Sequence, residues 1–211
     1  MSRHACMLAA LAATLVASSI ARAEAADPAP VKAIWKPQEI NFYYQSFTTF
    51  YSCTGLEDKL KRILRELGVQ GTVRVRSADC PTAVARMPRV LMNVVSPVAA
   101  TPQALAERDK HKSKRELSAR VRGETEELED ALEEFPAQWR RVPLSRGSLG
   151  LEPGDCELID ELQRKVLPKL AVRIVSNNVH CAPNQTTLGQ PQLEVEALIA
   201  MPKPDEAQKK Q

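Results

Sequence analysis

The amino-acid sequence predicts an α+β fold made of two tandem strand-helix-strand-strand units, each with one helix packed on a small, mainly antiparallel sheet. Three observations favour this fold: four cysteines at matching places in two halves, an amphipathic helical pattern after the first cysteine of each half, and strand-like segments in the same order around both patterns. We expect the two units to lie side by side, and a sheet that joins them is one arrangement left open. The expected organisation is a signal peptide at 1–23, a linker at 24–37, the first unit at 38–100, a charged connecting segment at 101–137, the second unit at 138–201 and a flexible tail at 202–211.

Residues 1–23 have the pattern of a secretory signal peptide. Arg3 precedes an apolar run that extends from Met7 to Val16, and small residues follow up to Ala23. A membrane anchor needs about 20 consecutive apolar residues, and this run is too short. We therefore expect an exported protein, periplasmic in a Gram-negative bacterium and otherwise secreted.

Composition and charge exclude several classes of protein. Hydrophobic residues make up 44% and charged residues 26% of the chain, which is typical of a soluble globular protein. Without residues 1–23, 27 basic and 26 acidic residues remain, a balance that does not favour a nucleic-acid or membrane-surface binder. The 8 glycines form no GxxxxGK[ST] or GxGxxG loop. We expect no nucleic-acid partner and no membrane span, and the sequence gives no sign of an oligomeric state.

The cysteines left after residues 1–23 are Cys53, Cys80, Cys156 and Cys181. An even number of cysteines in an exported chain predicts two disulfides. Cys53 and Cys156 each precede a helical pattern, and the other two each follow the next strand. We therefore predict bonds between Cys53 and Cys80, 27 residues apart, and between Cys156 and Cys181, 25 residues apart. A zinc or thioredoxin-like site would need closely spaced pairs such as CxxC, so we expect no metal and no cofactor.

The first unit begins with residues 38–51, rich in aromatic and β-branched side chains, which predict one long strand or two short ones. Thr54 and Glu57 have the spacing of a capping box at the start of a helix, and Gly68 supplies a left-handed stop at its end. Strands are predicted at residues 72–76 and 89–98. The apolar face of the helix is expected to contain Leu56, Leu60, Ile63, Leu64 and Leu67.

The second unit repeats this order 103 residues later, the offset between Cys53 and Cys156. Asp155 is expected to cap a helix that reaches towards Leu170, and Pro168 should end or kink that helix early. Strands are predicted at residues 138–145, 172–176 and 192–200. Agreement of helix face, cysteine placement and strand order indicates an internal duplication.

The connecting segment is predicted to contain a short helix that starts at Thr101-Pro102, a strand at 117–121 and a second short helix that ends near Phe135. Residues 108–122 hold seven basic side chains, and residues 124–134 hold seven acidic ones. We expect a solvated surface with internal ion pairs, and a strip that docks a partner is the alternative.

Few residues suggest catalysis. His111 and His180 are the only histidines after the signal peptide, and no HExxH, GxSxG or EF-hand pattern occurs. We expect no catalytic residue. The alternative is an exported enzyme of unrecognised type, either a hydrolase that uses His180 with nearby acids or a thiol oxidoreductase that uses one cysteine pair.

Seven of the nine aromatic residues lie between Trp35 and Tyr51. In a strand, Tyr44 points to one face and Tyr43 to the other. Packing in the core is the first interpretation of this cluster. The second is a recognition surface that includes Tyr43, Tyr44 and Tyr51, because tyrosine offers a large apolar face with a polar tip.

The run Phe47-Thr48-Thr49-Phe50-Tyr51-Ser52-Cys53-Thr54-Gly55-Leu56, together with Cys80, resembles a stretch of uncharacterised exported proteins of proteobacteria. The resemblance implies a periplasmic location and carries no activity or site residue. From the whole sequence we expect a non-catalytic binding or structural module that recognises a protein or a cell-envelope component.

Overall fold

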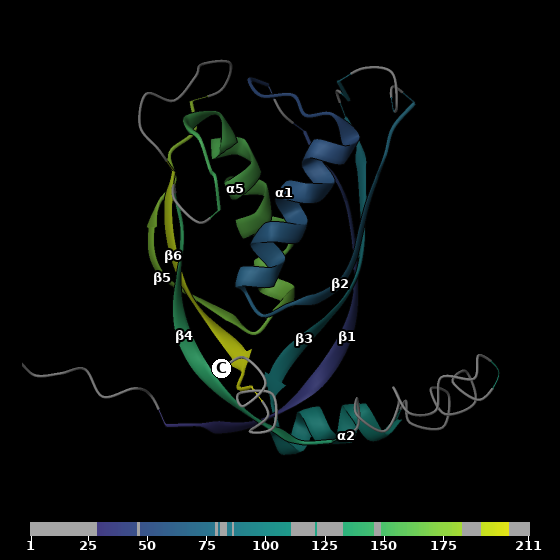
Figure 1. Cartoon of the computed structure of the whole chain (residues 1–211), viewed down its shortest axis with the longest axis vertical. Helices are drawn as coiled ribbons and strands as arrows, with labels where there is room; N and C mark the ends of the chain where they lie inside the picture. The colour runs from purple at the N-terminus through teal and green to yellow at the C-terminus, as the bar shows by residue number, and fades with distance from the viewer. Residues whose placement is uncertain are drawn as a thin grey trace, which may run out of the picture.

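The computed structural model is an α+β fold with one six-stranded antiparallel sheet, in the order β2-β3-β1-β4-β6-β5 (Figure 1). It describes residues 29–45, 47–78, 80, 84–85, 87–110, 121, 133–145, 149–182 and 191–202. The strands are β1 (Val31–Tyr43), β2 (Gln70–Arg76), β3 (Arg89–Ala99), β4 (Phe135–Leu144), β5 (Val172–Asn178) and β6 (Gln192–Ala200). The helices are α1 (Cys53–Glu66), α2 (Pro102–Lys110) and α5 (Cys156–Lys165), with short 3-10 helices η1 (Pro153–Asp155) and η2 (Leu167–Lys169).

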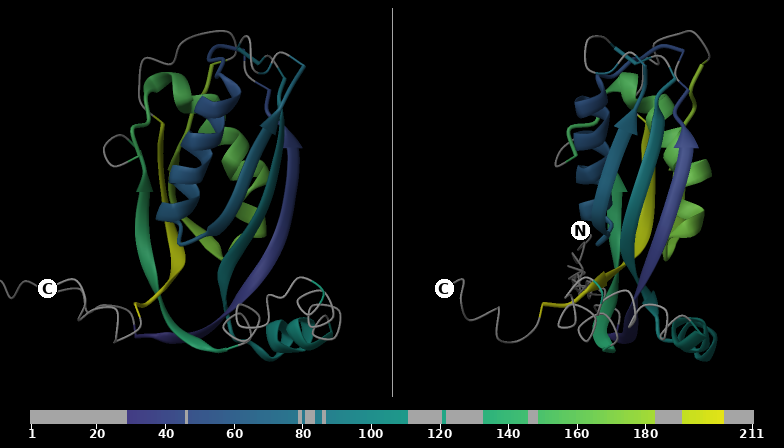
Figure 2. Two further views of the ribbon diagram at one scale, coloured as in Figure 1. Left: turned by 45° about the vertical axis from the view of Figure 1, so that its right-hand side comes forward. Right: turned by 90° about the vertical axis from the view of Figure 1, so that its right-hand side faces the viewer.

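The sheet has two arms, β2-β3-β1 and β4-β6-β5. They join where β1 residues 31–33 pair with β4 residues 135–137. Beyond this joint the arms diverge, and α1 and α5 lie between them (Figures 1 and 2). We call the end of the arms away from the joint, at the top of Figure 1, the apical end. It carries the loops 44–52 and 77–88.

One large hydrophobic core connects the two arms, and a smaller cluster of Ala33, Ala137 and Leu198 lies at the joint. All five predicted residues of the α1 face are buried, and they belong to the same cluster as the buried residues of α5 and η2. The α5 side of this cluster contains Leu158, Ile159, Leu162, Val166, Leu167 and Leu170. The expected picture of one helix on its own small sheet in each unit is therefore incomplete, because the two helices share one core.

The ends of the helices follow the prediction in part. Ser52, rather than Thr54, caps α1: its Oγ accepts a hydrogen bond from Gly55 N at 3.1 Å. Glu57 turns instead to β2, where its Oε1 accepts from Val75 N at 2.8 Å. Gly68 has a φ of 71°, as its predicted role at the end of the helix requires. In the second half, α5 ends at Lys165, ahead of Pro168 as predicted.

Several boundaries differ from the expected ones. β1 begins at Val31, inside the expected linker, because residues 31–33 are needed for the joint between the arms. Phe135, expected on a helix, begins β4 and stacks on Trp35 with ring centroids 4.6 Å apart. Val121, the described residue of the strand expected at 117–121, is helical. The predicted signal peptide, most of the connecting segment and nearly all of the tail lie outside the described residues.

Candidate functional site

Both predicted disulfides are present and lie at the apical end. Cys53 is the first residue of α1 and is bonded to Cys80 in the loop after β2, with a Cα–Cα distance of 6.0 Å. Cys156 is the first residue of α5 and is bonded to Cys181, which follows β5, with a Cα–Cα distance of 5.7 Å. Each disulfide therefore ties the start of a helix to the chain that follows the next strand.

The three tyrosines of the predicted recognition surface have different environments. Tyr43, the last residue of β1, is 60% exposed. Tyr44 is only 1% exposed and packs in the core, so it cannot contact a partner. Tyr51 is partly buried against that core, and its ring centroid lies 5.7 Å from that of Tyr44. Of the three, only Tyr43 lies on an open surface.

Tyr51 belongs to a polar cluster that links the two halves of the chain. Its hydroxyl donates a hydrogen bond to Asp155 Oδ1. Lys59 Nζ lies 2.7 Å from both carboxylate oxygens of Asp155, and Glu152 N donates to Oδ2 at 2.7 Å. Asp155 is 1% exposed. Asp155 stands at the N-cap position of α5 as predicted, but its carboxylate makes no capping bond to α5 and instead binds these three groups.

This cluster is suited to holding the structure together rather than to proton transfer. Burial, reinforced by the hydrogen bond to Asp155, raises the pKa of Tyr51 far above its usual value of 10.0. Its hydroxyl therefore stays protonated at neutral pH and acts as a donor. A general base would need a pKa near the working pH, and Tyr51 is moved in the opposite direction.

The loop 44–52 crosses from the first half of the chain to the second. Phe47 N and Thr48 N donate to Glu157 Oε2, in the first turn of α5, at 3.0 and 3.2 Å. A Cβ built on Gly154 would lie 2.7 Å from Thr49 Oγ1, so the side chain of Thr49 occupies the space that a side chain at position 154 would need. Both halves of the chain therefore fix the position of this loop.

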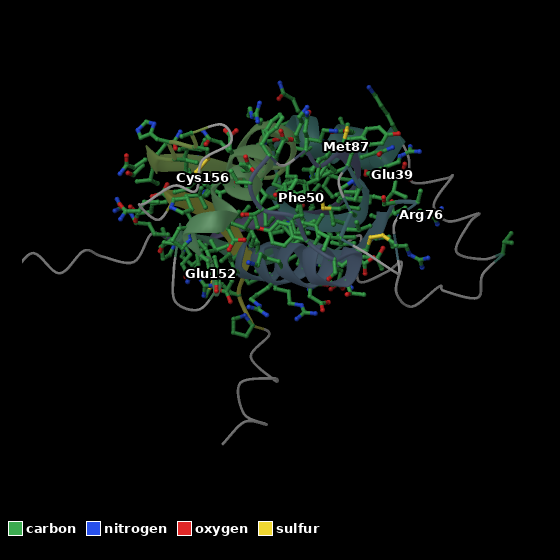
Figure 3. All side chains as sticks on the ribbon, turned by 90° about the horizontal axis from the view of Figure 1, so that it is seen from above. Glu39, Phe50, Arg76, Met87, Glu152 and Cys156 are labelled. Atoms are coloured by element: carbon green, nitrogen blue, oxygen red, sulfur yellow. A yellow bond between two sulfur atoms is a disulfide. The ribbon has the colours of Figure 1, made fainter. Side chains whose placement is uncertain are left out.

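Five large apolar side chains stand exposed at the apical end, and we call them the apical patch: Tyr43, Phe47, Phe50, Val84 and Met87. Phe47 and Phe50 are 54% and 45% exposed although a shared core lies beneath them. Figure 3, a view onto this end, shows Phe50 near the middle of the face and Met87 to one side of it.

Hydrogen bonds tie together the segments that carry the patch. Tyr44 N donates to Pro88 O at 3.0 Å, which brings the end of β1 to the start of β3. Ala85 N donates to Tyr51 O at 3.1 Å, which brings the loop 77–88 to the loop 44–52. Sequence reasoning missed Val84 and Met87. Their signal was the presence of apolar residues between two predicted strands, where a loop is usually polar.

The residues of the alternative enzyme interpretation do not come together. His180 is exposed, and no described residue forms a hydrogen bond or ion pair with it. Cys156 is buried, which does not favour thiol exchange at the second disulfide. His111 and most of the acidic run at 124–134 lie outside the described residues. Within the part of the chain that the structure describes, no group of three potential metal ligands is found.

Searches with this chain found no matching protein-family model, no similar curated protein and no similar solved structure. None of the helices in the described ranges is long and apolar enough to cross a membrane.

Proposed function

We propose that this chain is an exported, non-catalytic binding module that captures a partner protein through the apical patch. The observation that carries the proposal is the exposure of five large apolar side chains, one at the end of β1 and four on adjoining loop segments, which hydrogen bonds and a disulfide hold in place. Loops fixed before binding lose little conformational freedom when the partner docks, so more of the contact energy remains as affinity.

Protein is the partner class that this chemistry fits best. Phenylalanine, tyrosine and methionine are enriched in the centres of protein interfaces. A glycan site would need several polar groups around an aromatic platform, whereas four of the five patch residues are purely apolar. Of the cell-envelope components considered, we therefore favour a protein surface with an apolar centre.

A proposed duplication strengthens the functional interpretation of the patch. The order β1-α1-β2-β3 matches β4-α5-β5-β6, and the order of strands in the sheet reads the same from either edge under this match. At the offset of 103 residues, the counterparts of Tyr43, Phe47 and Phe50 are an arginine, a glycine and a proline (residues 146, 150 and 153). The second unit therefore folds without aromatic residues at these three positions. Because the fold does not require them, the exposed aromatic residues of the first unit favour a role in binding.

The proposed location is the periplasm or another oxidising compartment. Two disulfides persist in such compartments and are rare in the reducing cytosol. The signal-like residues 1–23 favour the same location.

Site-specific photo-crosslinking tests the proposal. A photoreactive phenylalanine analogue is placed at Phe50 and, as a control, at Ile174, an exposed apolar residue of β5 away from the patch. In exported protein irradiated in intact cells, we expect one defined protein adduct from position 50 and none from position 174. The adduct partner is then purified, and Phe50→Ser should weaken its binding at least about tenfold, while Ile174→Ser should not.

The opposite results would overturn the proposal. Adducts only to lipid or glycan at position 50 would assign the patch to another class of ligand. Equal crosslinking at positions 50 and 174 would show that the patch has no specific partner.

A further inference from the structure

A groove runs between α1 and β2, on the side of the molecule where β2 forms the edge of the sheet. The cavity has a volume of about 580 Å³. Leu64, Val69 and Val73 give it apolar walls, and Glu57, Lys61, Arg65 and Arg74 give it a charged rim. None of these residues belongs to the apical patch.

The outer edge of β2 presents unpaired backbone groups to this groove. Val75 N points away from β3, because it donates to Glu57 Oε1 at 2.8 Å. The bond from Tyr44 N to Pro88 O agrees with this orientation. By the register, the backbone N–H and C=O groups of the even-numbered residues of β3 point towards β1, and those of the odd-numbered residues point towards β2. By the two-residue period of a strand, the N–H and C=O groups of Val73 and the C=O group of Val75 also point outward, whereas Gly71, with a φ of 130°, departs from the regular strand.

No described residue accepts a hydrogen bond from Val73 N. The strand thus offers a donor and acceptors at two-residue spacing, which an added extended strand can match. A compact ligand or a helix cannot pair with groups at this spacing, so the backbone geometry selects an extended peptide.

The charges of the rim select the side chains of that peptide. Lys61 is paired with Glu57 at 3.3 Å and with Asp58 at 3.9 Å. Arg65 and Arg74 are exposed, and neither forms an ion pair with a described residue. Two unpaired guanidinium groups beside an apolar groove favour an acidic side chain on the incoming strand.

The other edge of the sheet differs from β2. The pairing of β5 with β6 shifts register between Ile174 and Ser176. Such a bulge twists an edge strand and disrupts the regular spacing that an added strand would need. The sheet therefore has one edge that can accept a strand and one that is protected.

We infer that β2 is a docking edge for an extended, acidic segment of a partner protein, which adds to the sheet as a seventh strand in the groove beside α1. The segment hydrogen-bonds to the outward backbone groups of Val73 and Val75, and its apolar side chains enter the groove that Leu64 and Val69 line. Separate acidic side chains of the segment bind Arg65, on α1, and Arg74, which alternates with the buried Val73 and Val75 on β2. This inference stands without the apical patch.

The test uses the full disulfide-bonded chain and a phage-displayed library of random dodecapeptides. We expect selected peptides to alternate apolar and polar residues and to contain Asp or Glu. Binding of a selected peptide should slow hydrogen exchange at Val73 N, while exchange at Thr72 N, which points towards β3, stays unchanged. Selection of no peptide, or protection of amides elsewhere, would overturn the inference.

Charge reversal supplies the second measurement. The double variant Arg65→Glu with Arg74→Glu should bind the selected acidic peptide at least about tenfold more weakly and should bind a Lys-substituted version better. The double variant Arg140→Glu with Lys169→Glu, at two exposed positions outside the groove, is the control matched in charge and should leave peptide binding unchanged. Equal loss in the control and in the first double variant would reduce the effect to net charge and contradict the site.

Phe50→Ser separates this inference from the proposed function. It should leave peptide binding at β2 unchanged, and loss of crosslinking at the apical patch would not affect the result at β2. If Phe50→Ser abolished peptide binding, the peptide would bind at the apical patch and the β2 site would be wrong. If the chain bound to a second copy of itself and this protected Val73 N in the same way, the occupant of the groove would be that second copy. This result would also contradict the proposal of a partner protein.

Discussion

At the scale of single residues, Asp155 stabilises contacts between distant parts of the chain and does not only mark the start of a helix. Its carboxylate has almost no contact with water and is held by Tyr51, Lys59 and the backbone of Glu152. A buried carboxylate is tolerated only when charge and hydrogen bonds compensate for lost hydration. Removing it would leave a partly buried ammonium group and a buried hydroxyl without their partner.

We predict that Asp155→Ala lowers the free energy of unfolding by about 3 kcal/mol, because breaking a buried ion pair from one side leaves the other charge uncompensated. Urea unfolding at neutral pH measures the change. Asp160→Ala is the control, since its partner Arg164 forms an exposed pair within one helix. It should cost about 0.5 kcal/mol or less. A cost at Asp155 no larger than at Asp160 would contradict the role of the cluster.

The partners of Asp155 could not be predicted from the sequence. Tyr51 and Lys59 lie 104 and 96 residues away along the chain, and local patterns contain no information about such contacts. The pattern predicts a helix cap because aspartate is a common capping residue. The proposed duplication offers one hint: at the offset of 103 residues Asp155 corresponds to Ser52, which does cap its helix, so a different residue at this place indicates a different role.

Tyr51 should make stability depend on alkaline pH. Its pKa is raised in the folded chain, so the folded state holds this proton more tightly than the unfolded state does. The resulting stabilisation is complete below the unfolded-state pKa of about 10 and is lost progressively as pH rises above it. We expect the free energy of unfolding to fall more steeply above about pH 10 in the unchanged chain than in Tyr51→Phe.

Urea unfolding at several alkaline pH values compares these two chains with Tyr43→Phe, which removes an exposed hydroxyl. Tyr43→Phe should keep the slope of the unchanged chain. The prediction fails if Tyr51→Phe and the unchanged chain have the same slope.

At the scale of elements, α1 is the part of the fold that the sequence predicts best. Its five-residue apolar face, its glycine stop and its disulfide to the loop after β2 are all present. These features follow from local periodicity and backbone preference, which a sequence expresses directly. Its first residue is less well predicted, because Ser52 and Thr54 are both good caps and the contact of Glu57 on α1 with Val75 on β2 decides between them.

Gly68 links the end of α1 to the second half of the chain. Its φ of 71° favours glycine, and an added Cβ would lie 3.2 Å from Ile199 Cγ1 on β6. We predict that Gly68→Ala destabilises the chain by about 1 to 2 kcal/mol, from left-handed backbone strain and this close contact. Urea unfolding measures the loss. Glu66→Ala, two residues earlier, should change stability by less than about 0.5 kcal/mol. Equal effects would refute the special role of Gly68.

The same scale shows why the apical patch was predicted only in part. Alternation along β1 correctly separates Tyr43 from Tyr44, but it does not say which face of the strand meets the core. That choice depends on where α1 and α5 pack. Phe47 and Phe50 lie in a loop without periodicity, and the hydrogen bonds to Glu157 that fix this loop join distant parts of the chain.

At the scale of the whole molecule, the two arms form one sheet through a short joint, and two helices between them complete one core. The order of strands and helix along the chain in each arm follows from local patterns, whereas the order of the strands in the sheet was not predicted. The joint does not follow from local patterns, because it uses residues 31–33, which have the composition of a linker. Both proposed binding surfaces depend on this shared core, since it fixes the apical loops and holds α1 beside β2.

Native-state hydrogen exchange as a function of urea tests the shared core most directly. The slowest amides of β3, in the middle of the first arm, are compared with those of β6, in the middle of the second. We predict that both sets open with the same free energy and the same dependence on urea, and that both match global unfolding. Two distinct opening free energies, one for each arm and each with a smaller dependence on urea, would contradict the shared core.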